Sequence, residues 1–125
     1  MRYLIDTNIF IYAATDVDSL RDDVLEIVQD YDTELCMSAV SVRELIVAFR
    51  HKGFDTRKWR SAEKLVKSIT DEFFISILPV GMDVMKTYAK LQLNEREGHN
   101  DPSDHVIISQ ALTERLPLIS SDRRF

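Results

Sequence analysis

Short apolar runs alternate along this chain with longer stretches in which apolar residues recur at helical spacing. The short runs predict strands at residues 2–6, 35–37, 73–78 and 116–120. The longer stretches predict helices at residues 9–14, 19–31, 41–51, 59–69, 84–93 and 102–112. Because strands and helices alternate, we expect a mainly parallel sheet of four or five strands with helices on both faces. No linker or internal repeat interrupts the pattern, so residues 1–125 are expected to form a single α/β domain.

Composition adds to this picture mainly an expected cellular compartment. The chain has 125 residues, 45% of them hydrophobic and 30% charged, which is ordinary for one globular domain. Its single cysteine, Cys36, excludes an intrachain disulfide and lies in an apolar run, which favours a place in the core and a reducing environment. No signal-peptide core and no apolar run of about 20 residues is present. We therefore expect a cytoplasmic protein without a membrane partner.

Carboxylates follow two of the predicted strands. Asp6 comes directly after the first apolar run, and Asp122 follows the last one. In open α/β sheets, ligands bind beyond the carboxyl ends of the strands, so both residues are candidates for a site on this rim. Each also has a plain structural explanation, since Asp6 or Thr7 could cap the next helix and Asp122 could belong to a turn.

Two further segments bring acids to helix starts. Ser41-Val42-Arg43-Glu44 matches a capping box, in which Glu44 would bond back to the cap backbone. A cap at Ser38 instead would free Glu44 and turn it toward the rim. Asp101-Pro102-Ser103-Asp104 reads as a second helix start, where one acid suffices for the cap and Asp104 would lie at the edge of the core.

Four segments thus bring Asp6, Glu44, Asp104 and Asp122, with Asp101 close by, to one end of the predicted sheet. Like charges gathered in this way repel by several kcal/mol at intermediate dielectric, so they need cations. Oxygen ligands without a Cys or His pattern favour Mg²⁺ or Mn²⁺ over Zn²⁺. Such sites commonly hydrolyse phosphodiesters, because the metal activates a bound water and offsets charge on the phosphate oxygens.

The same residues carry a family signature that spans almost the whole chain. The motifs are Leu4-Ile5-Asp6-Thr7-Asn8, Ser41-Val42-Arg43-Glu44-Leu45, the segment from His99 to Ala111, and the segment from Leu118 to Phe125. In this order they resemble PIN-domain proteins, in particular the ribonuclease toxins of VapBC-type toxin–antitoxin pairs. The resemblance implies a three-layer α/β/α PIN-like domain.

The resemblance also implies roles for residues and partners. Asp6, Glu44, Asp104 and Asp122 match the acidic quartet that holds Mg²⁺ or Mn²⁺, and Asp101 matches an extra acid. Asn8 and Ser120 match polar residues beside the quartet. The expected function is a metal-dependent endoribonuclease toxin that acts on RNA, forms a homodimer and is silenced by a cognate antitoxin. Ser103 and His105 depart from the family pattern, where Phe and Arg are usual, and His105 is expected to cover the core rather than to contact substrate.

A basic segment modifies the inference from net charge. The overall charge of −5 argues against a nucleic-acid partner unless bound cations cancel part of it. Between residues 50 and 60, however, five cations accompany Phe54 and Trp59, which could steer RNA through phosphate contacts and base stacking. The five are Arg50, Lys52, Arg57, Lys58 and Arg60. The alternatives are a solvated helix–loop–helix anchored by Trp59, or an antitoxin groove.

Two other functions compete with the nuclease. One is a non-catalytic PIN domain that binds protein or RNA. The complete acidic quartet argues against this alternative. The other is a phosphoryl-transfer domain of the receiver or phosphatase type. A receiver needs an acidic pair and a lysine at the end of a late strand, and a phosphatase needs the motif Asp-x-Asp. Asp6-Thr7-Asn8, with no such lysine later in the chain, fits neither.

Overall fold

The computed structural model describes residues 1–91 and 102–121, and these form an α/β domain. In chain order the elements are β1 (Arg2–Ile5), α1 (Thr7–Thr15), the 3₁₀ turn η1 (Val17–Ser19), α2 (Asp22–Gln29), β2 (Glu34–Ser38), α3 (Ala39–Arg50), α4 (Ala62–Asp71), β3 (Ser76–Leu78), α5 (Met82–Lys90), α6 (Pro102–Glu114) and β4 (Leu118–Ile119). All four predicted strands and all six predicted helices are therefore found, with shifted ends. Asp101, Asp122 and the last residues of the helix predicted at 84–93 lie outside the described residues.

The four strands form one parallel sheet in the order β3-β2-β1-β4. The chain proceeds outward from β1 through β2 to β3 and then returns to place β4 on the other side of β1. The connections therefore diverge between β1 and β4, which is the switch point where open α/β sheets bind their ligands. This confirms the predicted parallel sheet and fixes its size, among the described residues, at four strands.

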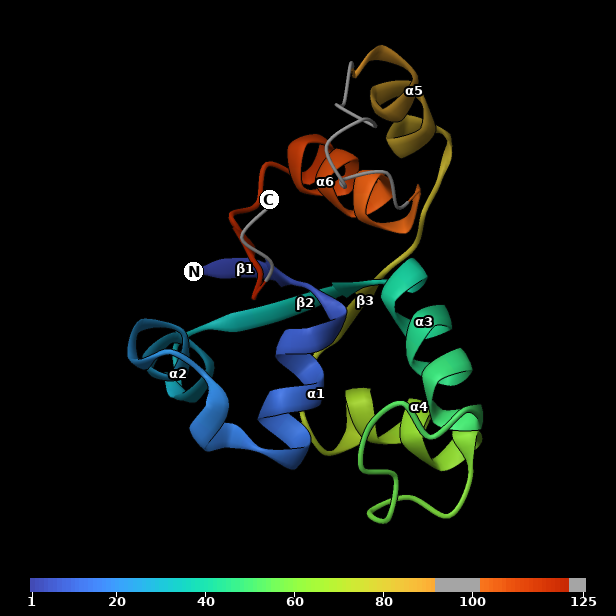
Figure 1. The fold of residues 1–125 in the computed structure, drawn as a ribbon. Helices are drawn as coiled ribbons and strands as arrows, with labels where there is room; N and C mark the ends of the chain where they lie inside the picture. The colour runs from blue at the N-terminus through green and yellow to red at the C-terminus, as the bar shows by residue number, and fades with distance from the viewer. Residues whose placement is uncertain (92–101, 122–125) are drawn as a thin grey trace.

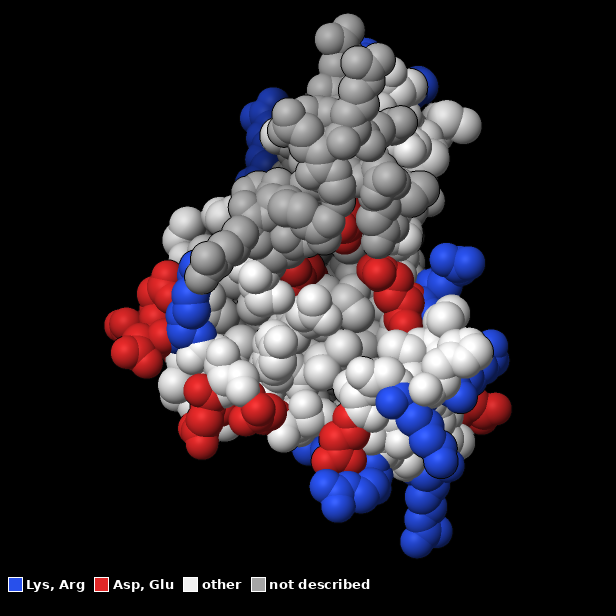
Figure 2. All heavy atoms as spheres, in the orientation of Figure 1, with Lys and Arg blue, Asp and Glu red and all other residues white. Residues whose placement is uncertain are grey.

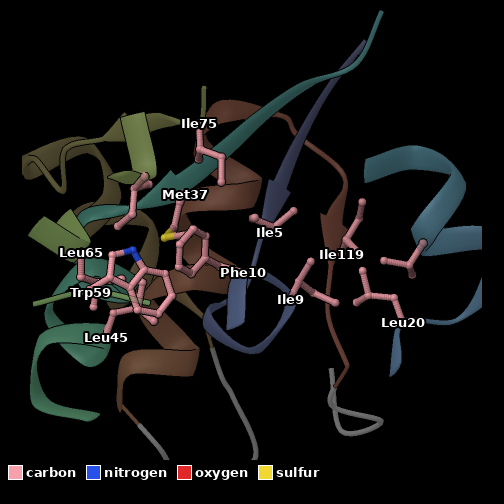
Figure 3. Packing of buried hydrophobic residues seen from close by; sticks show 12 residues of the cluster. Ile5, Ile9, Phe10, Leu20, Met37, Leu45, Trp59, Leu65, Ile75 and Ile119 are labelled. Atoms are coloured by element: carbon pink, nitrogen blue, oxygen red, sulfur yellow. The ribbon is translucent and has the colours of Figure 1, made fainter. Parts of the chain in front are cut away.

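Helices cover both faces of the sheet, as Figure 1 shows. Successive strand residues point to opposite faces, so Leu4 and Cys36 face α6, whereas Ile5 and Met37 face α1 and α3. The cluster on the α1 side is the larger of the two and joins α1, α2, α3 and α4 (Figure 3). On the other face α5 packs on α6, and the hydroxyl of Thr113 donates to that of Thr87 over 2.8 Å. The result is the expected three-layer arrangement.

Trp59 fastens the loop between α3 and α4 to the larger cluster. Its indole is 7% exposed and stacks on Phe10 with ring centroids 6.5 Å apart. The indole nitrogen donates to the Ser68 hydroxyl over 2.9 Å, so the polar edge of the ring is satisfied in the core. The interpretation of Trp59 as an anchor is thus confirmed, whereas the alternative, stacking on RNA bases, does not suit a buried ring.

Helix ends account for the main differences from the predicted boundaries. The strand predicted at residues 73–78 is only Ser76–Leu78, because Phe73 and Ile75 donate their N–H groups back to the last turn of α4. Phe74 has a φ of 54°, a left-handed conformation that ends a helix. The helix predicted from residue 59 begins at Ala62, since Ser61 caps it through a 3.1 Å bond from the N–H of Lys64.

The helices are short compared with a lipid bilayer. Among the residues that the structure describes, none is long and apolar enough to cross a membrane.

Candidate active site

Asp6 lies at the switch point between β1 and β4, and it also caps α1. The residue is 5% exposed. One carboxylate oxygen, Oδ1, accepts the N–H of Ile9 over 3.0 Å, and the other, Oδ2, accepts the hydroxyl of Ser120. Its own N–H donates to the carbonyl of Ile119 over 3.0 Å, which joins the start of α1 to β4. The two interpretations of Asp6, cap and rim carboxylate, are therefore compatible.

Burial of a carboxylate at this position is costly unless partners offset the lost hydration. Two hydrogen bonds and the positive end of the α1 dipole stabilise the charged form of Asp6. Ser120, which follows β4 directly, is half-buried and oriented by this bond. Asn8, by contrast, is exposed on the first turn of α1. The chain thus holds a preformed, oriented carboxylate at the carboxyl end of β1.

Glu44 reaches the same rim from α3. The capping-box interpretation is wrong, because α3 begins at Ala39 and its cap is Ser38, whose hydroxyl accepts the N–H of Val40 over 3.1 Å. Glu44 therefore belongs to the second turn of α3, is half-buried, and accepts the Thr7 hydroxyl at Oε1 over 2.9 Å. Sequence reasoning considered Thr7 only as a possible helix cap and missed its bond to Glu44, since nothing in the sequence gives the register of α1 against α3.

Asp104 lies in the first turn of α6 and is half-buried. Two carbonyl groups at the carboxyl end of β3 hold this helix in place: the Gln110 amide donates to Pro79 over 2.9 Å and to Leu78 over 3.3 Å. His105 is 1% exposed, which agrees with a place in the core and leaves it no access to substrate. The predicted ligands Asp101 and Asp122 lie outside the described residues.

The donor chemistry of the described part fits a hard divalent cation. Asp6, Glu44 and Asp104 come from three different elements and offer carboxylate oxygens only, as Mg²⁺ and Mn²⁺ prefer. Within residues 1–91 and 102–121, no three His, Cys, Asp or Glu side chains lie close enough together to form a metal site by themselves. The other predicted ligands, Asp101 and Asp122, fall outside these ranges.

The basic segment between α3 and α4 lies to one side of this rim. Figure 2 shows Lys and Arg side chains gathered over α3, α4 and the loop between them, while acidic side chains lie in separate groups elsewhere on that face. Lys58 pairs with Glu72 over 2.9 Å and lies 4.9 Å from the centre of the Phe73 ring. Among the described residues, no acid pairs with the exposed cations Arg50, Lys52 and Arg60.

Arg57 is paired within the same loop. Its guanidinium binds both carboxylate oxygens of Asp55, over 2.9 and 2.8 Å. These hydrogen bonds lower the pKa of Asp55 to about 2 and raise the pKa of Arg57 above its usual value. Arg57 thus offsets the charge of Asp55 at neutral pH.

Comparison with known proteins gives a consistent result. The model of the PIN domain family matches residues 3–125. A structure of VapBC2 from Rickettsia felis, bound to a DNA fragment from the VapBC2 promoter, aligns with a TM-score of 0.69 and 19% identity. The alignment covers 100% of this chain and 91% of that one. FitAcB from Neisseria gonorrhoeae aligns with a TM-score of 0.61 and 20% identity over 98% and 88% of the two chains. A toxin–antitoxin complex from Klebsiella pneumoniae aligns with a TM-score of 0.59 and 19% identity over 96% and 86%. The comparison with curated proteins gives no match.

Proposed function

This chain belongs to the PIN domain family, and on that premise we propose that it is a metal-dependent endoribonuclease, the toxin of a type II toxin–antitoxin pair. The observation that carries the proposal is Asp6, a buried carboxylate oriented at the switch point of the sheet by Ile9 and Ser120. The similarity of this chain's fold to the chains of toxin–antitoxin complexes supports the assignment to a toxin.

The reaction is hydrolysis of an RNA phosphodiester. A water oxygen forms a bond to phosphorus, the bond from phosphorus to one ribose oxygen breaks, and that oxygen leaves with a proton. Mg²⁺ or Mn²⁺, when bound, supplies a water of lowered pKa and offsets charge on the phosphate oxygens. Asp6, Glu44, Asp104 and Asp122, with Asp101, are the residues that would hold the ion.

The chain's own part is to keep these carboxylates oriented before substrate arrives. Ser120 and the N–H of Ile9 fix both oxygens of Asp6, and Thr7 fixes one oxygen of Glu44. Both arrangements are built at the start of α1, whose positive end also favours an approaching phosphate. Preorganised groups of this kind lower the barrier because they need little reorganisation during the reaction.

The partners follow from the same proposal. Single-stranded RNA would approach along the basic segment, where Arg50, Lys52 and Arg60 are exposed and Arg57 and Lys58 are already paired with acids. A cognate antitoxin would block the rim, and the active form would be a homodimer in the cytoplasm.

The experiment compares RNA cleavage by the wild type and by Asp6→Asn, with Mg²⁺, with Mn²⁺ and with EDTA, in the absence of antitoxin. Asparagine keeps the shape of Asp6 and caps a helix as well as aspartate does, so the fold is expected to persist. Asp32→Asn is the matched control, because it makes the same chemical change at an exposed residue at the amino end of the sheet. We expect cleavage by the wild type and the control with metal only, and none by Asp6→Asn.

Two outcomes contradict the proposal in different ways. Full activity of Asp6→Asn would remove Asp6 from the chemistry. A wild type that binds RNA but cuts none with either metal would favour the alternative, a PIN domain that acts as a binding module.

A further inference from the structure

A cleft of about 460 Å³ runs along α1 beside the rim that holds Asp6. One wall is α1 itself and the other is the loop after α3. The residues that matter for its chemistry are Asn8, Tyr12, Thr15, Asp16, Phe54 and Asp55. Sequence reasoning did not find this cleft, because it needs the loop after α3 to fold back against α1.

The position of the cleft relates it directly to the proposed chemistry. Asn8, Tyr12 and Thr15 follow one another at helical spacing, so they line one face of α1. At a rise of 1.5 Å per residue, the distance along the helix axis from Asn8 to Asp16 is about 12 Å. Asn8 is two residues from Asp6. The cleft therefore begins next to the rim that holds Asp6, and an RNA strand with one base in the cleft can pass along this rim.

Two aromatic side chains face the cleft from opposite walls. Tyr12 comes from α1 and Phe54 from the loop, and both are half-buried. Phe54 is held in place from behind by the edge-to-face contact with Trp59, with ring centroids 6.0 Å apart. Since Trp59 is itself bonded to Ser68, the loop wall is rigidly connected to the core. Fixed aromatic rings of this kind are the usual platform for unpaired bases.

The polar groups of the cleft are mainly hydrogen-bond acceptors. Thr15, Asp16 and Asp55 line it, and the lining contains no Lys or Arg. Arg57 occupies both carboxylate oxygens of Asp55, so the exposed carboxylate of Asp16 is the acceptor that faces a bound group. Phosphate is therefore a poor occupant. A base with an exocyclic amino group can donate to a carboxylate, as cytosine does in protein–DNA complexes, whereas uracil has no such group. The Asn8 amide can both donate to and accept from a base.

From these observations we propose that the cleft is a subsite for one unpaired nucleobase of the RNA substrate, next to the bond that is cut, and that it prefers a base with an amino group over uracil. The base lies between Tyr12 and Phe54, and its amino group faces Asp16. This subsite rests on the proposed ribonuclease function, but its binding does not depend on cleavage.

The test measures binding of short 2′-O-methyl oligoribonucleotides, which resist cleavage, by fluorescence anisotropy in EDTA. The variants are Tyr12→Leu and Phe54→Leu, which remove one stacking ring each. Phe73→Leu is the matched control, because Phe73 is also half-buried and packs on Phe10 without lining the cleft. Tyr12→Phe keeps the ring and serves as the rescue, and thermal melts report whether each variant is folded.

We expect the dissociation constant to rise roughly 5- to 150-fold in each leucine variant that lines the cleft, the range that loss of one base–aromatic stack gives. It should change less than about twofold in Tyr12→Phe and in Phe73→Leu. For the wild type, an oligonucleotide of cytidine should bind more tightly than one of uridine. Folded leucine variants with wild-type affinity would overturn the subsite and leave a protein segment as the occupant of the cleft.

The binding experiment can fail or succeed independently of the proposed nuclease activity. If the wild type binds these oligonucleotides through Tyr12 and Phe54 but cuts no RNA with metal, the subsite holds and the nuclease fails. If the leucine variants bind and cut RNA as the wild type does, with the same base preference, the nuclease holds and the subsite fails.

Discussion

Replacing Thr7 by valine removes the hydroxyl that connects α1 to α3 and keeps the branched shape of the side chain. The hydroxyl donates to Glu44 over 2.9 Å, and both residues are half-buried. A hydrogen bond to a charged group contributes about 1.5–3 kcal/mol when its partners are well buried. Because water still reaches this pair, we expect a coupling free energy of about 1 kcal/mol.

A double-mutant cycle isolates this value. Urea unfolding in EDTA is measured for the wild type, Thr7→Val, Glu44→Ala and the double variant. Removing a carboxylate from an acidic rim can itself stabilise the metal-free protein, and Glu44 has interactions besides the one with Thr7. The cycle cancels these separate effects and leaves only the term between the two residues. Additivity within about 0.3 kcal/mol would refute the inferred link between α1 and α3.

The same substitution tests whether the link serves catalysis. If Thr7 orients Glu44 for metal binding, kcat/KM for RNA cleavage by Thr7→Val should fall about tenfold, which corresponds to about 1.4 kcal/mol. A variant destabilised by 1 kcal/mol remains folded at assay temperature, so loss of fold would not explain the change. Unchanged cleavage would mean that the bond supports the fold alone.

Further predictions concern three buried residues, Trp59, Gln110 and Cys36. Trp59→Phe should lower the free energy of unfolding by about 2 kcal/mol, because it removes the bond to Ser68 and leaves space in the core. Gln110→Glu should cost about 3 kcal/mol or more at pH 7, because a carboxylate would face the carbonyl of Pro79, and calorimetry should find a smaller loss at pH 4. Burial raises the pKa of the Cys36 thiol, despite the nearby guanidinium of Arg2, so native protein at pH 8 should react with a thiol reagent far more slowly than protein in urea. Since the folded-state pKa exceeds the unfolded one, Cys36 should also make stability fall as pH rises above about 8.5.

Local patterns were enough to predict the elements of this fold, because buried strands and amphipathic helices carry their periodicity in the sequence. The parallel sheet follows from their alternation, and Asp6 follows from its place after the first strand. The ends of the elements were less predictable. Phe73 and Phe74 look like strand residues, but hydrogen bonds back to α4 hold this segment as a helix end.

The contacts within the site needed three dimensions. Ser38 and Ser41 both precede Glu44 and both can cap a helix, so the sequence could not tell which serine does so or which way Glu44 points. The bonds from Thr7 to Glu44 and from Ser120 to Asp6 join segments 37 and 114 residues apart, and no local pattern encodes them. Tyr12 gave no signal either, because its role in the cleft depends on the loop that Trp59 anchors.

Metal binding to Asp6 is the central claim, and isothermal titration of Mn²⁺ tests it most directly. The titration compares the wild type, Asp6→Asn and the control Asp32→Asn under identical conditions. We predict that the wild type and Asp32→Asn bind Mn²⁺ with equal affinity and that Asp6→Asn binds it at least tenfold more weakly. Equal affinity of all three proteins would contradict the claim that Asp6 is a central metal ligand.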